Sequence, residues 1–154
     1  MKVNTSRITE IFNVTVDETK TVEELVADGN YCSNYNCDIK NFLDCSNGDK
    51  KAAIKNMAIF HFKGAVTTTG VFDLMEKEGY RPATVHELLS LGMEPEYQRE
   101  FMIIALGFKP LLRLGGYECR YALYLYDANC LGIVPTEGRF LDHCRFAGVR
   151  KQVY

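Results

Sequence analysis

The hydrophobic residues of this sequence follow two patterns, each typical of a different environment in a folded domain. Residues 57–62 and 101–106 are apolar at nearly every position, which predicts two strands covered on both faces. Residues 118–126 alternate, which predicts a strand with two unlike faces. One face carries Cys119, Tyr121, Leu123 and Leu125, and the other carries Arg120, Ala122, Tyr124 and Tyr126. Val14 and Val16 indicate a further short strand near the start of the chain.

The carboxy-terminal half predicts an antiparallel meander. Residues 127–129 favour a turn after the alternating strand, and residues 131–134 can return beside it as a partner strand. Residues 145–151 then form the final strand of the meander.

Two short helices are predicted before the middle of the chain. Thr21 and Glu24 stand three positions apart, the spacing of a capping box, and Gly29 is placed to end the helix that they open. A second helix runs to Glu78 with apolar residues at helical spacing, after a cap within the threonine run 67–69.

The stretch 79–89 joins two elements through a sharp change of backbone conformation. Gly79 ends the preceding helix, and Pro82 forces extended chain on the residue before it. Thr84 and Glu87 form another capping box, so a new helix begins there. In this helix Val85, Leu88 and Leu89 share one face, which leaves His86 and Glu87 on the other face or at its edge.

These elements predict a single α+β domain spanning residues 1–154, with short helices packed on a mainly antiparallel sheet. A chain of 154 residues with 47% hydrophobic and 25% charged residues is long and apolar enough to fold without metal or disulfides.

Charge and hydropathy narrow the classes of partner. A formal charge of −2 and a pI of about 5.9 supply no field that would gather nucleic acid or an anionic membrane. No window approaches the roughly 20 apolar residues of a membrane helix, and no export signal is seen at the start. We expect a soluble cytoplasmic protein whose six cysteines stay reduced.

A cysteine cluster lies in the segment 30–51, which is rich in Asn, Asp, Ser and Gly and predicts an irregular loop. Cys32, Cys37 and Cys45 could hold zinc with His61 as a fourth ligand, although the Cys-x2-Cys spacing of common zinc sites is missing. The alternative, which we favour, is that they are buried thiols, with no metal and no cofactor. His61 itself is expected to be largely buried.

Candidate catalytic residues do not assemble into a known motif. His61, His86 and His143 are possible bases, Cys144 a possible nucleophile and Asp142 an orienting group. Adjacent residues of a strand face opposite ways, so His143 is poorly placed to activate Cys144. Ser90 stands where a His-Glu-x-x-His zinc motif would need its second histidine. We therefore assign no catalytic residue.

The arginine and tyrosine side chains of the alternating strand are the first candidates for binding. Arg120, Tyr124 and Tyr126 could present a sheet face to a ligand or to acidic groups of a partner protein. Arg81 and His86, beside the capping turn, are further candidates. The alternative is that these arginines pair with nearby acidic residues and lie over the tyrosines.

Several of these segments carry a resemblance. Gly79-Tyr80-Arg81-Pro82-Ala83-Thr84 with Glu87-Leu88-Leu89, the segment 98–107, and the ending 145–151 resemble a group of small uncharacterised bacterial proteins from candidate-phylum and environmental genomes. This resemblance spans roughly residues 14–151 and implies no activity. Residues 81–87 and 145–150 are also similar to two landmarks of C-type-lectin-like domains of the sulfatase-modifying type, which implies a C-type-lectin-like fold.

These observations favour a non-enzymatic module that recognises an unidentified protein or small ligand through the loop 30–51 and the Arg/Tyr face. The alternative is a small enzyme or zinc-supported domain that uses the cysteine and histidine residues.

Overall fold

The structure is a computed structural model that describes residues 6–29, 31, 51–94, 102–107, 111–114, 117–126, 130–141 and 143–151. The predictions for the rest of the loop 30–51, for the connector 95–100 and for the turn 127–129 lie outside these residues. Among the described residues, no helix combines the length and apolar character needed to cross a membrane.

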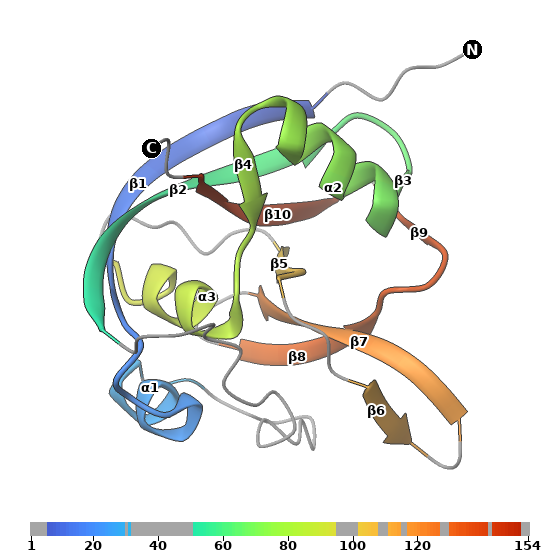
Figure 1. The fold of residues 1–154 in the computed structure, drawn as a ribbon. Coiled ribbons are helices and arrows are strands. Elements are labelled where there is room, and N and C mark those ends of the chain that lie inside the picture. Colours follow the sequence, from blue (N-terminus) through green and yellow to red (C-terminus); the bar gives the residue numbers. More distant parts are fainter. Residues whose placement is uncertain are drawn as a thin grey trace.

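The described part contains three helices and two sheets (Figure 1). The helices are α1 (Val22–Asp28), α2 (Thr68–Lys77) and α3 (Val85–Leu91). The larger sheet consists of β1 (Ser6–Asp17), β2 (Ala52–Phe62), β4 (Tyr80–Pro82), β5 (Met102–Ala105), β6 (Leu111–Leu114), β7 (Tyr117–Tyr126), β8 (Cys130–Pro135) and β10 (Cys144–Arg150). The smaller sheet pairs β3 (Val66–Thr67) with β9 (Arg139–Phe140). The α+β class and the mainly antiparallel sheet are confirmed.

The strand order of the larger sheet is β1-β2-β10-β5-β7-β6, with β4 beside β10 and β8 beside β7. The predicted hairpin of β7 and β8 is confirmed, and residues 145–150 lie in the predicted strand β10. The meander prediction is wrong for β10, which lies between β2 and β5, antiparallel to the first and parallel to the second. Residues 146–149 are all buried, so this strand is apolar on both faces and suits the centre of the sheet.

The β1 strand is longer than predicted, because it begins at Ser6 and pairs with β2 along its whole length. Its second half, which contains Val14 and Val16, shows a clear alternation of exposed and buried residues. From Ile11 to Val16 exposed and buried residues alternate strictly, as a sheet with one covered face requires.

All three predicted helix starts are confirmed. Thr21 and Thr84 each form a complete capping box with the glutamate three residues later, and the Thr67 hydroxyl accepts from the N–H of Gly70. Gly79 follows α2 with φ of 83°, a left-handed conformation that glycine adopts without the strain of a Cβ. The chain then turns directly into β4.

The larger sheet has an apolar cluster on each face. In Figure 1, α3 lies inside the curve formed by β1 and β2, whereas α2 and β4 lie across the region of β10. The α3-side cluster includes Val14, Met57, Ile59, Leu88, Leu89, Ile103, Leu123 and Val149. The α2-side cluster includes Ala58, Phe60, Phe62, Val71, Met75, Tyr80, Ile104 and Phe146. Helix α2 therefore covers one face of the sheet, whereas α3, with α1 beside it, covers the other.

This arrangement corrects one expectation about burial. We expected His86 and Glu87 to lie away from the buried face of their helix, but every residue of α3 is buried, with His86 3% and Glu87 0% exposed. His61 was expected to be largely buried, and its exposure in the structure is intermediate. Met57 and Ile59 belong to the α3-side cluster, and His61 lies one step beyond them along β2, where that cluster ends.

Candidate functional site

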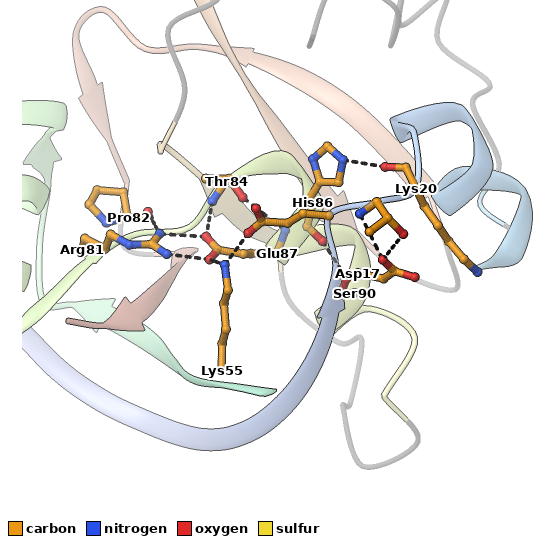
Figure 2. Close-up of polar contacts among 11 residues, drawn as sticks. Asp17, Lys20, Lys55, Arg81, Pro82, Thr84, His86, Glu87 and Ser90 are labelled. Atoms are coloured by element: carbon orange, nitrogen blue, oxygen red, sulfur yellow. Dashed lines mark hydrogen bonds and ion pairs between the residues drawn. The ribbon is translucent and has the colours of Figure 1, made fainter. Parts of the chain in front are cut away.

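A group of charged side chains surrounds Glu87 at the start of α3 (Figure 2). Arg81 approaches with both terminal nitrogens, Nη1 at 2.8 Å from Oε1 and Nη2 at 2.6 Å from Oε2. Lys55 Nζ lies 2.9 Å from Oε2, and the N–H of Thr84 donates to Oε1 at 2.8 Å. Lys55 also lies 2.5 Å from Oε1 of Glu18. We call Glu18, Lys55, Arg81 and Glu87 the charge cluster.

The cluster keeps a fully buried carboxylate ionised. Burial by itself would raise the pKa of Glu87, because a low-dielectric surrounding disfavours the charged form. The hydrogen bonds and charge of Arg81, the Thr84 N–H and the Lys55 ammonium outweigh burial and lower the pKa to about 2. In turn, the hydrogen bond that Arg81 donates to Glu87 is the main cause of the raised pKa of Arg81.

Four separate segments supply the cluster: the residue after β1, the first half of β2, β4, and the first turn of α3. Two acidic and two basic groups cancel, and both oxygens of Glu87 are already occupied by donors. A carboxylate with a pKa this low and no vacant acceptor is a weak general base at neutral pH. We therefore interpret the charge cluster as a structural set of ion pairs that fixes α3 against the sheet.

The structure gives Arg81, a predicted binding residue, a structural task. Besides Glu87, its Nη1 donates to the carbonyl of Pro82 at 3.2 Å. Its side chain is still 38% exposed, so part of it faces solvent. A ligand could reach that part while the bidentate pair with Glu87 is retained.

His86, another predicted binding residue, connects α3 to the turn before α1. Its Nε2 lies 2.9 Å from the carbonyl oxygen of Lys20 (Figure 2), and the hydroxyl of Ser90 donates to the carbonyl of His86 at 2.7 Å. Because only 3% of the surface of His86 is exposed, a ligand in solution cannot contact its ring in this conformation.

A nearby contact that the sequence did not predict anchors the start of the loop 30–51. Tyr31 is buried, and its hydroxyl donates to the carbonyl of Leu89 at 2.6 Å. Gly92 makes room for this ring, because a Cβ there would lie 2.1 Å from the Tyr31 hydroxyl. A tyrosine beside Asn and Cys gave no signal of burial, since its partner is a backbone carbonyl far along the chain.

The predicted Arg/Tyr face of β7 is partly covered. Ala122 is 1% exposed, and Tyr124 packs against the α2-side cluster. The Tyr124 ring also covers Gly132, its partner in β8, where a Cβ would lie 2.4 Å from the ring. Tyr126 is 49% exposed at the end of the strand, and the backbone of Arg120 pairs with Leu111 in β6. The covered middle corrects the expectation of a continuous open face.

The candidate nucleophile lies in the described part of the chain, whereas most of the candidate metal ligands do not. Cys144 is buried at the start of β10, whereas the preceding His143 is exposed and lies in the turn before this strand. Asp142, Cys32, Cys37 and Cys45 lie outside the described residues. In the part of the chain that the structure describes, no group of three or more His, Cys, Asp or Glu residues could hold a metal ion.

The sequence analysis missed an exposed apolar surface on the larger sheet. Ile11 is 58% and Ile54 74% exposed. Register places both on the face that bears the α2-side cluster, because Ile11 pairs with Ala58 of that cluster and Ile54 pairs with Thr15. Asn13 and Asn56 lie between them, with their amides 3.3 Å apart. We call Ile11, Asn13, Thr15 and Ile54 the open sheet end.

Comparisons with known proteins add no relative to this description. No protein-family model matches the chain, and no curated protein or solved structure is similar to it.

Proposed function

We propose that this chain is a non-enzymatic module that binds another protein or a small ligand. The observation that carries the proposal is the open sheet end, where two isoleucines, 58% and 74% exposed, extend the apolar α2 side of the sheet into solvent. Covering an exposed isoleucine is worth about 1.5–3 kcal/mol, so two of them can supply a useful part of a binding free energy.

The position of this surface supports a protein partner over a small ligand. The open sheet end lies on the face of the curved β1–β2 pair that is opposite to α3, which lies inside the curve (Figure 1), whereas small molecules favour concave sites. Apolar residues surrounded by polar ones on a sheet surface are typical of protein contacts. Asn13 and Asn56 can offer hydrogen bonds between the two isoleucines, which would fix the orientation of a partner.

Tyr126, the loop 30–51 and Arg81 are alternative binding surfaces. Tyr126 offers an aromatic ring at the end of β7, on the strand that also carries Arg120. The loop 30–51 starts from Tyr31, which is anchored on α3. The exposed part of Arg81 is a further possible contact. Binding through these surfaces is an alternative hypothesis to binding through the open sheet end.

The test is capture of partners from an extract by immobilised protein, compared between matched variants. The double variant Ile11→Thr and Ile54→Thr keeps β-branched residues and removes apolar surface. We expect it to lose the captured partner, with a drop of at least about tenfold in bound material. Leu141→Thr is the control, because Leu141 is equally apolar and 58% exposed elsewhere on the molecule.

The variant Tyr126→Ala tests the competing surface at the end of β7. If capture survives the double isoleucine change and disappears with Tyr126→Ala, the binding surface lies at the end of β7 and not at the open sheet end. Equal capture by all variants and the natural chain would contradict a role for either surface.

Finer assignments also stay hypotheses. We propose that the chain is bacterial, as the resemblance suggests, and that it works in the cytoplasm. The similarity of residues 81–87 to C-type-lectin-like domains rests on a capping turn that many folds share, and it is retained only as a hypothesis about fold.

A further inference from the structure

Arg150, the last residue of β10, is an exposed cation beside the open sheet end. It lies one step beyond the pair of Met57 with Val149, which places it next to Asn56 of β2. Asn56 in turn pairs with Asn13 of the open sheet end, and directly opposite residues of antiparallel strands share one face. Arg150 therefore borders the open sheet end on the same face of the sheet, one strand away from it.

An aromatic ring holds the guanidinium of Arg150 in place. The Cζ atom of Arg150 lies 6.0 Å from the centroid of the Tyr80 ring, which is 3% exposed and belongs to the α2-side cluster. The hydroxyl of Tyr80 lies 3.5 Å from Oδ1 of Asn56. A guanidinium has five N–H donors, so one that lies over a ring can still donate to a carboxylate.

The acidic residues at the end of α2 do not neutralise Arg150 directly. Glu76 is the nearest one with an ion pair, and its partner is Lys151. Glu78 follows α2 and makes no ion pair with Arg150, and Asp73 lies further back in the helix. Among the residues that the structure describes, Arg150 thus has no carboxylate partner.

The acidic residue at the far end of the same face is too distant to offset this charge. Asp17 lies opposite Ala52, and the four residues from Ala52 to Asn56 span about 13 Å of strand. This distance exceeds the Debye length of about 8 Å at physiological ionic strength. The carboxylate of Asp17 also accepts hydrogen bonds from the N–H and the hydroxyl of Thr19.

We propose that the open sheet end, together with Arg150, binds an acidic and aliphatic segment of another protein. The inference rests on the proposed function and names the class of partner. Aliphatic side chains of the segment cover Ile11 and Ile54, and an aspartate or glutamate of the segment pairs with the guanidinium. Apolar contact supplies affinity with little selectivity, whereas a bidentate arginine–carboxylate pair selects for an acidic group.

The spacing of the two features fits one short peptide. Ile54 lies two positions before Asn56 along β2, and β10 is the next strand, so the backbones of Ile54 and Arg150 are about 8 Å apart. Side chains two positions apart in an extended peptide are separated by about 7 Å, and those three or four positions apart on a helix by about 5–6 Å. An aliphatic and an acidic side chain of one segment can therefore reach both.

The charge pattern favours a protein segment over a nucleic acid. Asn13, Thr15 and Asn56 are neutral, and Arg150 alone supplies positive charge to this face. A phosphate backbone is held by several lysine and arginine residues at once, whereas a single arginine suits a single carboxylate.

The first test is selection of short random peptides, displayed on phage, by the immobilised natural chain. We expect the selected peptides to carry Asp or Glu within four positions of Leu, Ile or Val. The variant Arg150→Glu should select Lys or Arg in place of the acidic residue. This variant should fold, because Arg150 is exposed and its side chain contacts the ring of Tyr80 from the solvent side.

The second test measures the affinity of one selected acidic peptide, made synthetically, by isothermal titration calorimetry. Arg150→Gln and Ile54→Thr should each weaken binding at least about tenfold. Raising NaCl from about 0.05 M to about 0.5 M should weaken binding by the natural chain and leave Arg150→Gln nearly unchanged. Arg139→Gln, at an exposed position in β9, is the matched control and should bind like the natural chain.

The outcomes separate this inference from the proposed function. Selection of aliphatic peptides without acidic residues, lost in the Ile11→Thr and Ile54→Thr double variant, would overturn the acidic partner and leave the binding surface. Acidic peptides that bind Arg150→Gln as well as the natural chain would also overturn it. Binding that depends on Arg150 alone, and that acetate displaces, would reduce the site to a small-anion contact and contradict both. Failure to select any peptide would overturn the short segment as partner, while capture from an extract would still test the open sheet end.

Discussion

At the scale of single residues, Glu87 decides how the middle of the chain is held. It caps the first turn of its own helix through the N–H of Thr84 and binds Arg81 and Lys55 at the same time. Sequence spacing predicted the capping role alone. The charge partners come from β4 and β2, and their convergence on a side chain with 0% exposure explains why a glutamate is tolerated in a wholly buried helix.

Replacing this glutamate should be costly and pH-dependent. Glu87→Gln leaves Arg81 without its anion and Lys55 with Glu18 alone, so we expect the free energy of unfolding at pH 7 to fall by about 3 kcal/mol. The carboxyl has an ordinary pKa of 4.5 and a folded pKa of about 2. Its stabilisation is therefore fully present above pH 4.5 and is lost as the pH falls towards 2. Urea unfolding at several pH values should show the natural chain and the variant converging over this window.

Glu76→Gln is the matched control. Glu76 pairs with Lys151 but is 68% exposed, and such surface pairs contribute about 0–1 kcal/mol. The exposed Asp17, whose pKa is lowered mainly by hydrogen bonds from Thr19, is present in all three proteins and cancels in the comparison. A Glu87→Gln difference that stays constant from pH 5 to pH 2 would contradict the assigned protonation behaviour.

At the scale of elements, β4 and α3 are joined by a turn that another strand end must approach closely. The N–H of Gly107, just after β5, donates to the carbonyl of Ala83 at 2.8 Å. A Cβ on Gly107 would lie 2.5 Å from the carbonyl oxygens of Pro82 and Ala83. Since these atoms belong to the backbone, they cannot rotate away as a side chain would.

Gly107→Ala should therefore lower the free energy of unfolding by about 1–3 kcal/mol, the usual cost of forcing extra atoms into a packed region. Thermal and urea unfolding would measure the change.

Gly79→Ala distinguishes lack of space from backbone strain. Gly79 has a φ of 83°, and a methyl group added to its Cα would have nothing within 4 Å, so the variant should lose only the roughly 1 kcal/mol of a left-handed alanine. Gly107→Ala that is no more harmful than Gly79→Ala would contradict the close approach of β5 to the turn.

At the scale of the whole molecule, β10 is the strand around which the larger sheet is assembled. It pairs with β2, β4 and β5, and its side chains contribute to both apolar clusters. The last strand of the described chain therefore joins the amino-terminal strands to the β5-β7-β8 group. Folding of either group alone would leave an apolar strand position vacant.

Hydrogen exchange should show that β10 and its neighbour β2 are the most stable strands. We expect the slowest amides in residues 146–149 of β10 and 57–60 of β2, because these segments are buried and paired on both sides. Amides of β1, which has one partner strand among the described residues, should exchange faster. Mass spectrometry of peptides would measure the order, and equal rates in β1 and β10 would contradict the central place of β10.

The sequence by itself determined the local elements. Capping boxes at Thr21 and Thr84, the cap at Thr67 and the left-handed Gly79 each depend on residues within three positions of one another, so their signals can be found without a fold. Continuous apolar runs likewise identified β5 and part of β2 as covered strands.

Only the tertiary structure decided which strands are neighbours, and with them the charge cluster, the covered middle of β7 and the open sheet end. Arg81 and Glu87 are close in sequence, but Lys55 and Glu18 join them through strand pairing between β1 and β2. Exposure of Ile11 and Ile54 depends on where α2 stops covering the sheet. Periodicity reports which side chains share a face, whereas the partner of that face is set by long-range packing that no local spacing encodes.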